Sequence, residues 1–139
     1  MALKHDFFIK EPMEEIRDLS KCRYITDVSV DLILFMRDSL LWIETLHANN
    51  ELKFGIDYYG LTTFDSRAIV KLQSICENWV ALFKNAPTEF FLTGCLDLET
   101  FEHERVKFNK SVVIKQLQNL INLCDKALEL DLPIIHWGI

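Results

Sequence analysis

The sequence predicts a mainly α-helical domain: a bundle of three long helices plus a short N-terminal helix, with possible minor short β segments. Two stripes of apolar residues lead to this prediction, because steps of three and four residues place each stripe on one side of an α-helix. The stripes consist of Ile69, Leu72, Cys76, Trp79 and Phe83, and of Val113, Leu117, Leu120, Cys124 and Leu128. Each helix needs an apolar partner, so we expect the two to share one core.

Length and composition indicate one folded domain spanning residues 1–139. Hydrophobic residues make up 50% of the chain, which has only 4 Gly and 3 Pro. A chain of this size typically buries about 68% of its unfolded surface, and this composition supplies enough apolar material for a core. No internal repeat or linker divides the sequence. We expect a domain that folds without a metal or a disulfide.

The N-terminal part of the chain predicts a short helix and then a long one. Pro12 suits the first turn of a helix that continues to about Lys21, because its missing N–H would be unpaired there. Apolar residues repeat at helical spacing from about Asp31 to Ala48, which predicts the first long helix. Residues 24–30 have β-propensity, but a capping residue for the long helix could equally lie there.

The middle of the chain predicts short extended segments and the second long helix. Aromatic and β-branched residues around the glycines of residues 51–64 indicate one or two short extended segments or a small hairpin. Asp65 or Ser66 then caps a helix that must finish near Asn85, because Pro87 restricts the residue before it.

The last third of the chain predicts a short strand and the third long helix. Residues 89–94 are mostly apolar and end in glycine, which is typical of a strand. A highly charged stretch follows over residues 97–107. Asn109 or Ser111 begins a helix that runs to about Leu130, and a proline follows its end. We expect the apolar end of the sequence to pack back on the domain.

The charge balance disfavours nucleic acid and membranes as partners. The 15 basic and 21 acidic residues give a formal net charge of -6, which opposes attraction to phosphate backbones and anionic lipid. The apolar run Phe7-Phe8-Ile9 is too short for a signal peptide, and charged residues interrupt the longest predicted helix too often for a membrane span. We expect a soluble cytoplasmic protein, and the sequence leaves its oligomeric state open.

The cysteines and histidines form no recognisable metal motif. The 4 cysteines lie far apart without a Cys-x-x-Cys pair. Cys76 and Cys124 fall in the apolar stripes, where a free cysteine behaves as a small hydrophobic residue. No two histidines are three or four residues apart, and His103 lacks the second histidine of a zinc-protease helix. We expect no metal and no cofactor.

No set of catalytic residues is predicted. The sequence has no glycine-rich phosphate loop and no Gly-x-Ser-x-Gly elbow. His136 lies among apolar residues, where an imidazole hydrogen-bonded at the edge of the core is commoner than a catalytic base. Some aromatic residues could line a pocket, although aromatic residues at helical spacing are more often core. These residues are Trp42, Trp79, Phe83 and Trp137.

Two dense acidic runs are candidates for a docking surface. Such runs are usually solvated faces, but complementary charge also accelerates association with a basic partner and rejects acidic ones. One run, near the N-terminus, consists of Glu11, Glu14, Glu15 and Asp18. The run that we take as the candidate partner-binding site consists of Asp97, Glu99, Glu102 and Glu104.

Four segments resemble small uncharacterised bacterial proteins of the kind found beside polymorphic toxins. They are Leu61–Asp65 (LTTFD), Trp79–Pro87 (WVALFKNAP), Phe91–Gly94 (FLTG) and Ile134–Ile139 (IIHWGI), and they cover roughly the second half of the chain. The resemblance implies an immunity-type protein that blocks a toxin by binding it, with no catalytic residues to transfer.

Two functions from different classes follow. The leading hypothesis is a non-enzymatic binding protein whose acidic surface masks a basic toxin or another basic protein partner. The alternative is a small helical domain that binds an apolar ligand between helices, or that self-assembles through an apolar face. An enzyme assembled from scattered histidines and acidic residues is the least favoured.

Overall fold

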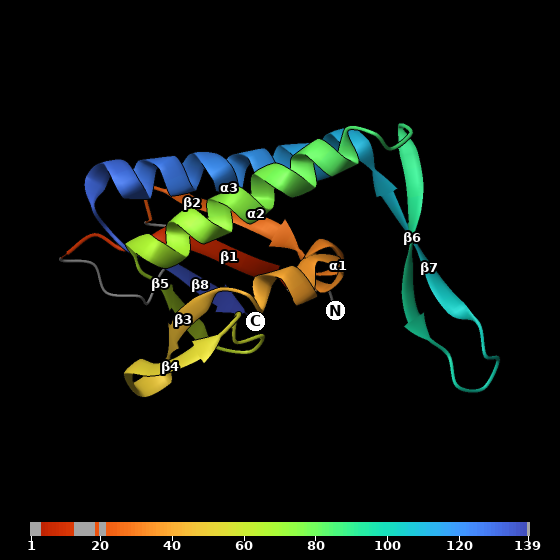
Figure 1. The fold of residues 1–139 in the computed structure, drawn as a ribbon, viewed down its shortest axis with the longest axis horizontal. Helices are drawn as coiled ribbons and strands as arrows, with labels where there is room; N and C mark the ends of the chain where they lie inside the picture. Colours follow the sequence, from red (N-terminus) through yellow and green to blue (C-terminus); the bar gives the residue numbers. More distant parts are fainter. Residues whose placement is uncertain (1–3, 13–18, 20–21, 139) are drawn as a thin grey trace.

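The computed structural model describes residues 4–12, 19 and 22–138, and it shows a layer of helices on a six-stranded antiparallel sheet (Figure 1). The strand order is β2-β1-β8-β5-β3-β4, and a separate pair, β6-β7, stands apart from this sheet. The prediction of a mainly helical bundle is therefore wrong. Helical periodicity located the second and third long helices correctly but gave no sign of the sheet that they cover.

The sheet joins strands from both ends of the chain. Its strands are β2 (Ile25–Ser29), β1 (Lys4–Ile9), β8 (Ile134–Gly138), β5 (Leu61–Phe64), β3 (Glu44–His47) and β4 (Glu51–Phe54). Successive side chains of a strand point to opposite faces. In β1, Phe7 and Ile9 belong to the main core cluster, whereas Phe8 is equally buried but lies outside that cluster. β1 is thus a strand buried on both faces, and no strand had been predicted there.

The helix layer consists of α1 (Val30–Leu40), α2 (Ser66–Phe83) and α3 (Lys110–Leu130). α2 and α3 pack against each other along their length (Figure 1). Leu72 of α2 and Leu117 and Leu120 of α3 are fully buried in one core, as the two stripes predict, and Trp79 packs against that core with its side chain half-buried.

Side-chain caps define the starts of both long helices. The Asp65 carboxylate accepts a hydrogen bond from the Ala68 backbone N–H (2.9 Å), and the Asn109 side chain accepts one from the Ser111 N–H (3.0 Å). Such caps satisfy N–H groups that have no partner inside the helix. α3 ends at Asp131, which adopts the left-handed conformation (φ 55°). The predicted positions of these two helices are confirmed.

The helix predicted from Asp31 to Ala48 is wrong in its second half. α1 ends at Leu40, and after a turn the chain enters β3. There Ile43 and Thr45 are buried while Glu44 is exposed, which is the two-residue alternation of a strand. Pairing with β4 on one side and β5 on the other replaces the helical conformation, so tertiary contacts override local spacing.

The other extended segments were only partly predicted. Residues 51–64 contain two strands, but β4 and β5 both pair with β3 and form no hairpin with each other. The end of the sequence packs on the domain as expected, yet it does so as β8, between β1 and β5. The predicted short helix from Pro12 to Lys21 lies almost entirely outside the described residues.

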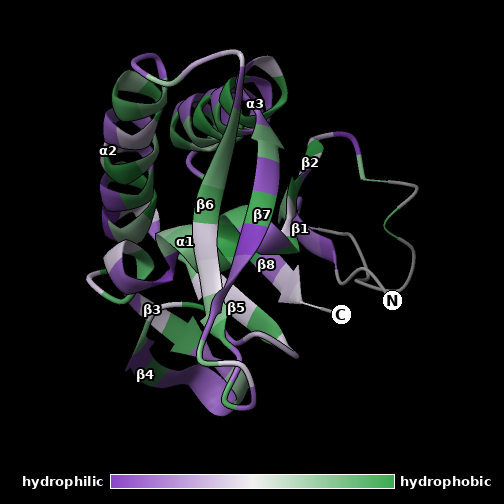
Figure 2. Ribbon diagram, turned by 90° about the vertical axis from the view of Figure 1, so that its right-hand side faces the viewer, coloured by the Kyte–Doolittle hydropathy of each residue, from purple (hydrophilic) through white to green (hydrophobic). Residues whose placement is uncertain are grey.

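A long hairpin projects from the end of the molecule where α2 finishes and α3 starts (Figure 1). Its strands are β6 (Glu89–Leu96) and β7 (His103–Asn109), paired antiparallel. We call residues 89–109 the arm. The strand predicted for residues 89–94 is present and slightly longer, whereas the charged stretch after it forms a turn and β7. Figure 2 shows that β6 is largely apolar to neutral while the middle of β7 is hydrophilic.

Shortening Leu117 to Ala should reduce the free energy of unfolding by about 2–5 kcal/mol, because a fully buried leucine leaves a cavity between the helices and the sheet. Val112→Ala is the matched control on the same helix, since Val112 is exposed and should change stability by less than about 0.5 kcal/mol. Chemical denaturation measures both. Equal midpoints for the two variants would contradict this placement of the core.

Candidate protein-binding site

A row of stacked aromatic rings anchors the arm to α2. Trp79 stacks on Phe83 (ring centroids 5.6 Å apart), Phe83 on Phe90 of β6 (5.7 Å), and Phe90 on Phe108 of β7 (5.8 Å). Aromatic pairs of this kind contribute about 0.5–1.5 kcal/mol each beyond the area that they bury. These four residues, which we call the aromatic row, therefore fix the base of both arm strands.

The same row holds α1 in place opposite the arm. The ring of Phe35 lies edge-on to Trp79 at 5.3 Å, and the Trp79 indole N–H donates a hydrogen bond to the Ser39 hydroxyl (3.0 Å). That hydroxyl donates in turn to the Met36 carbonyl (2.6 Å). α1 and the arm are thus oriented by one set of side chains.

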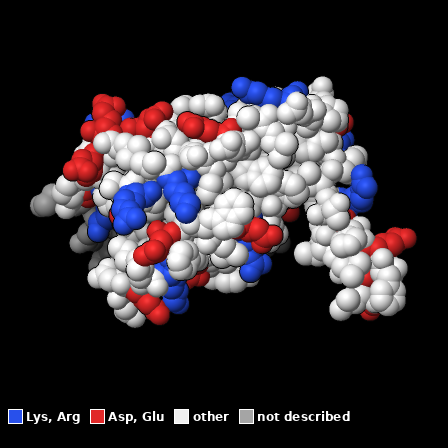
Figure 3. Space-filling model, viewed as in Figure 1, with Lys and Arg blue, Asp and Glu red and all other residues white. Residues whose placement is uncertain are grey.

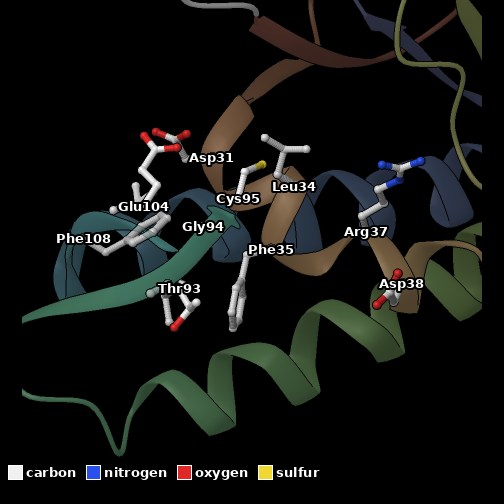
Figure 4. Close-up of a pocket in the computed structure, with 12 residues that line it drawn as sticks. Asp31, Leu34, Phe35, Arg37, Asp38, Thr93, Gly94, Cys95, Glu104 and Phe108 are labelled. Atoms are coloured by element: carbon white, nitrogen blue, oxygen red, sulfur yellow. The ribbon is translucent and has the colours of Figure 1, made fainter. Parts of the chain in front are cut away.

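A groove of about 400 Å³ lies between α1 and the arm. Figure 4 shows residues of α1 on one wall and residues of β6 and β7 on the other. We call it the arm groove. Its apolar side chains are Leu34, Phe35, Leu92, Val106 and Phe108. Its charged side chains are Asp31, Arg37, Asp38 and Glu104, so carboxylates predominate.

Gly94 allows the two arm strands to approach closely beside the groove. A Cβ atom at this position would lie 3.1 Å from the Glu104 Cβ and 3.2 Å from the Glu104 carbonyl oxygen. The pairing register of the strands shifts between Thr93 and Leu96, as in a β-bulge. Bulges of this kind bend a strand and redirect its side chains.

The arm tip, residues 96–102, is a turn that is stabilised by its own hydrogen bonds. The Asp97 N–H donates to the Glu102 carbonyl (2.8 Å), and the Asp97 carbonyl accepts from the Phe101 N–H (2.8 Å). The Asp97 carboxylate also accepts from the Glu99 N–H (2.8 Å). Phe101 adopts a left-handed conformation (φ 57°). Its side chain and that of Leu98 are each 77% exposed.

The structure brings the predicted partner-binding residues together on the arm, all of them exposed. Asp97, Glu99 and Glu102 lie in the tip, and Glu104 lies on β7 in the wall of the arm groove. In the second acidic run, Glu11 is described and half-buried, and the other three residues lie outside the described part of the chain.

Sequence reasoning missed the apolar residues that accompany these carboxylates. Leu98 and Phe101 interrupt a highly charged stretch without belonging to any helical stripe, and that contrast was the available signal. The contribution of α1 to the groove could not be found in the same way, because it depends on how the arm packs.

Away from the groove, two histidines form a pair inside the sheet. His5 Nδ1 and His136 Nε2 are 2.9 Å apart on neighbouring strands, and both rings are fully buried. Burial lowers the pKa of His5, and burial together with the neighbouring His5 lowers the pKa of His136 to about 3. Both rings are therefore neutral at pH 7. From the sequence we expected His136 to be hydrogen-bonded at the edge of the core. The structure instead places it inside the core, hydrogen-bonded to His5.

The cysteines also occupy the positions that the stripes imply. Cys76 and Cys124 are free and fully buried, and burial raises the pKa of both thiols, that of Cys124 to about 12. Among the described residues, no three side chains of the types that bind metals form a cluster. Within the same part of the chain, no helix has the length and apolar character needed to cross a membrane.

The fold and the groove define an α/β domain that carries a projecting β-arm. No known protein family, no curated protein and no solved structure matches the chain.

The buried histidine pair should make stability depend on pH. Unfolded histidine titrates near pH 6.5, but folded His136 resists protonation until about pH 3, so the unfolded chain binds more protons between these values. The free energy of unfolding is then highest above pH 6.5 and should fall by up to about 1.4 kcal/mol per pH unit below it for this group.

Denaturant midpoints measured from pH 7 to pH 5, where most carboxylates stay ionised, test this dependence. His136→Gln should flatten the slope. His103→Gln, which changes an exposed histidine on the arm, should preserve it. A wild-type midpoint that does not change over this range would show that the pair is accessible to protons in the folded state.

Proposed function

We propose that this chain is a non-enzymatic binding protein that recognises a basic protein partner through the arm tip and the arm groove. One observation supports the proposal most directly: a firmly anchored hairpin presents exposed apolar side chains among carboxylates. Exposed apolar patches that are rimmed by polar residues often mark protein interaction sites.

The apolar residues of the arm can supply affinity. Leu98 and Phe101 are mostly exposed at the tip, and Leu34 is exposed in the wall of the groove. Fully burying such a side chain contributes about 1.5–3 kcal/mol. In protein interfaces, a few apolar and aromatic anchors of this kind usually carry most of the binding energy.

The carboxylates of the arm can supply selectivity and speed of association. Complementary charge raises the association rate and rejects partners of like charge. The tip is already ordered by the hydrogen bonds around Asp97, and the aromatic row fixes the base of the arm, so binding need not order this segment. Rigid binding elements lose less conformational entropy on association.

The resemblance to immunity proteins suggests the class of partner. An immunity protein acts by covering a toxin, which requires a complementary surface and no catalytic groups. The net charge of -6 and the acidic arm fit a basic toxin that is met in the cytoplasm. The groove between α1 and the arm favours this function over a ligand site between helices, since the contact between α2 and α3 is filled by buried side chains.

Reversing Glu99, Glu102 and Glu104 to Lys should slow association with a partner isolated by affinity capture, and the defect should shrink as the salt concentration rises. The matched control reverses Glu77, Asp125 and Glu129, which are exposed on α2 and α3 and change the net charge equally. Stopped-flow kinetics at low and high salt would compare the two. Equal slowing by both triple variants would indicate a net-charge effect and reject the arm as the contact.

Phe101→Asn should weaken partner binding at least tenfold, about 1.4 kcal/mol, mainly through faster dissociation. Asparagine tolerates the left-handed conformation of this position better than phenylalanine, so the thermal midpoint should stay the same or rise. Titration calorimetry and a thermal melt measure the two effects separately. Unchanged affinity would exclude the tip from the interface.

A further inference from the structure

The arm has two free strand edges, and only one of them is protected by charge. Among the described strands, β6 and β7 pair only with each other, so each has one unpaired edge. β7 contains Glu104, Arg105 and Lys107, and charged residues of this kind protect an edge from pairing with other chains. β6 has no charged residue and no proline from Phe90 to Leu96 (Figure 2). β6 therefore forms the unprotected edge of the arm.

The register of the arm identifies the backbone groups on the free edge of β6. The Lys110 N–H donates to the Thr88 carbonyl (2.9 Å), so these opposite residues form a hydrogen-bonded pair. Bonded and non-bonded pairs alternate along an antiparallel ladder, which places Phe91 and Thr93 in non-bonded pairs. Their N–H and C=O groups point away from β7, and no backbone group of another described segment bonds to them. The bulge affects only the tip end of β6, since the pairing is regular from Glu89 to Thr93.

This free edge borders the arm groove. Successive side chains of a strand point to opposite faces, yet the neighbours Leu92 and Thr93 both line the groove. A groove that touches both faces of β6 passes around its edge, and this is the free edge because β7 covers the other one. β7 contributes only one face, through Glu104, Val106 and Phe108. Towards the tip, Figure 1 shows β6 on the side of the arm nearer the body of the domain.

The groove has the size of a short extended segment. A residue in a β-sheet occupies roughly 160 Å³, given the rise along a strand and the spacings between strands and between sheets. The groove volume of about 400 Å³ therefore holds about two or three residues of an added strand. Extended peptides bind in this way at open sheet edges, where main-chain hydrogen bonds supply affinity and alternate side chains supply specificity.

The charges of the groove favour a basic segment. Figure 4 shows Asp31 and Glu104 at the same end of the groove, away from Arg37. Neither carboxylate forms an ion pair with another described residue. The arm tip adds further Asp and Glu side chains (Figure 3). The same charges disfavour a second copy of this chain at the β6 edge, because two acidic arms repel each other.

We propose that an extended segment of the basic partner binds in the arm groove as an added strand on the free edge of β6. Its backbone pairs with Phe91 and Thr93, and a Lys or Arg side chain of the segment lies against Asp31 and Glu104. This inference rests on the proposed function, because the segment belongs to the partner of the arm. It adds the mode of recognition, which depends on the backbone of β6 as well as on side chains.

A synthetic peptide of alternating Lys and Val with capped ends is the probe for this mode. We expect it to bind the purified chain. A copy that is N-methylated at every backbone nitrogen should bind at least tenfold more weakly, because it keeps the charge and the side chains but has no N–H to donate. Titration calorimetry measures both affinities. Equal affinities, or no binding of the unmethylated peptide at millimolar concentration, would overturn the inference.

Amide hydrogen exchange followed by NMR locates the added strand. The Phe91 and Thr93 amides should exchange at least tenfold more slowly with saturating peptide, whereas Leu92, already bonded within the arm, should change little. Unchanged exchange at Thr93 would place the peptide elsewhere and overturn the inference. Slow exchange at Thr93 that depends on protein concentration without peptide would show pairing with a second copy, and it would overturn the inference as well.

Thr93→Pro removes the N–H that faces the groove and should weaken peptide binding at least tenfold. Proline is tolerated on an open strand edge, so the arm should stay folded. Two matched controls should keep the wild-type affinity. Thr93→Ala retains the N–H, and Arg105→Pro places the proline directly opposite, on the edge of β7. Equal peptide affinities of Thr93→Pro and Thr93→Ala would contradict strand addition, and the methylated peptide decides the question even if the proline variant unfolds.

Asp31→Asn with Glu104→Gln should weaken peptide binding several-fold at low salt and have little effect at high salt. Glu77→Gln with Asp125→Asn is the matched control, since both residues are exposed outside the groove. Equal affinities of the two double variants would overturn the proposed basic contact.

The proposed function fails or stands separately, through Phe101→Asn and the captured partner. If that variant weakens partner binding while the peptide leaves Thr93 unprotected, the binding function stands and only strand addition fails. If the peptide protects Thr93 while partner binding ignores the tip, the proposed role of the tip fails instead.

Discussion

The aromatic row, from Trp79 to Phe108, is the interaction on which the binding surface depends. A two-stranded hairpin alone is at best marginally stable in water, so the arm needs attachment to a larger body. Three successive ring contacts provide it, and they connect α2 with both strands of the arm. Because Phe35 contacts the same rings, the position of α1 is coupled to the position of the arm.

The domain separates the groups that stabilise it from the groups that we expect to bind. The sheet and helices bury the apolar stripes, the cysteines and the histidine pair, where burial keeps the titratable groups uncharged at neutral pH. The arm and the arm groove instead expose apolar and charged side chains at one end of the molecule. Changes on these outer elements should therefore alter recognition without disturbing the core.

The sequence predicted α2 and α3 well because their information is local. Apolar spacing, Asp65 and Asn109 mark the faces and starts of these helices without reference to the rest of the chain. The sheet was missed because its strands are short and several are buried on both faces, so they lack a clear alternation. β1 and β8 depend on each other across almost the whole chain, and no local pattern encodes such pairing.

The candidate site was predicted in the same partial way. The run from Asp97 to Glu104 was visible as a charged segment, but its meaning as the tip and wall of an arm required β6 and β7 to pair. The aromatic residues offered as a possible pocket proved to have different roles: Trp79 and Phe83 anchor the arm, whereas Trp42 is exposed in a shallow groove between β4 and the start of α2.

The position of β8 has a consequence for how the chain becomes folded during synthesis. β8 separates the β2-β1 pair from the β5-β3-β4 group, so the sheet remains in two unconnected parts until this strand arrives. All other described strands precede it in the chain. A nascent chain can form α2, the arm and α3 as each emerges from the ribosome, but the two parts of the sheet must wait with open edges. Contacts between residues so distant in sequence close slowly, which leaves the unpaired strand edges of the emerging chain exposed to mispairing.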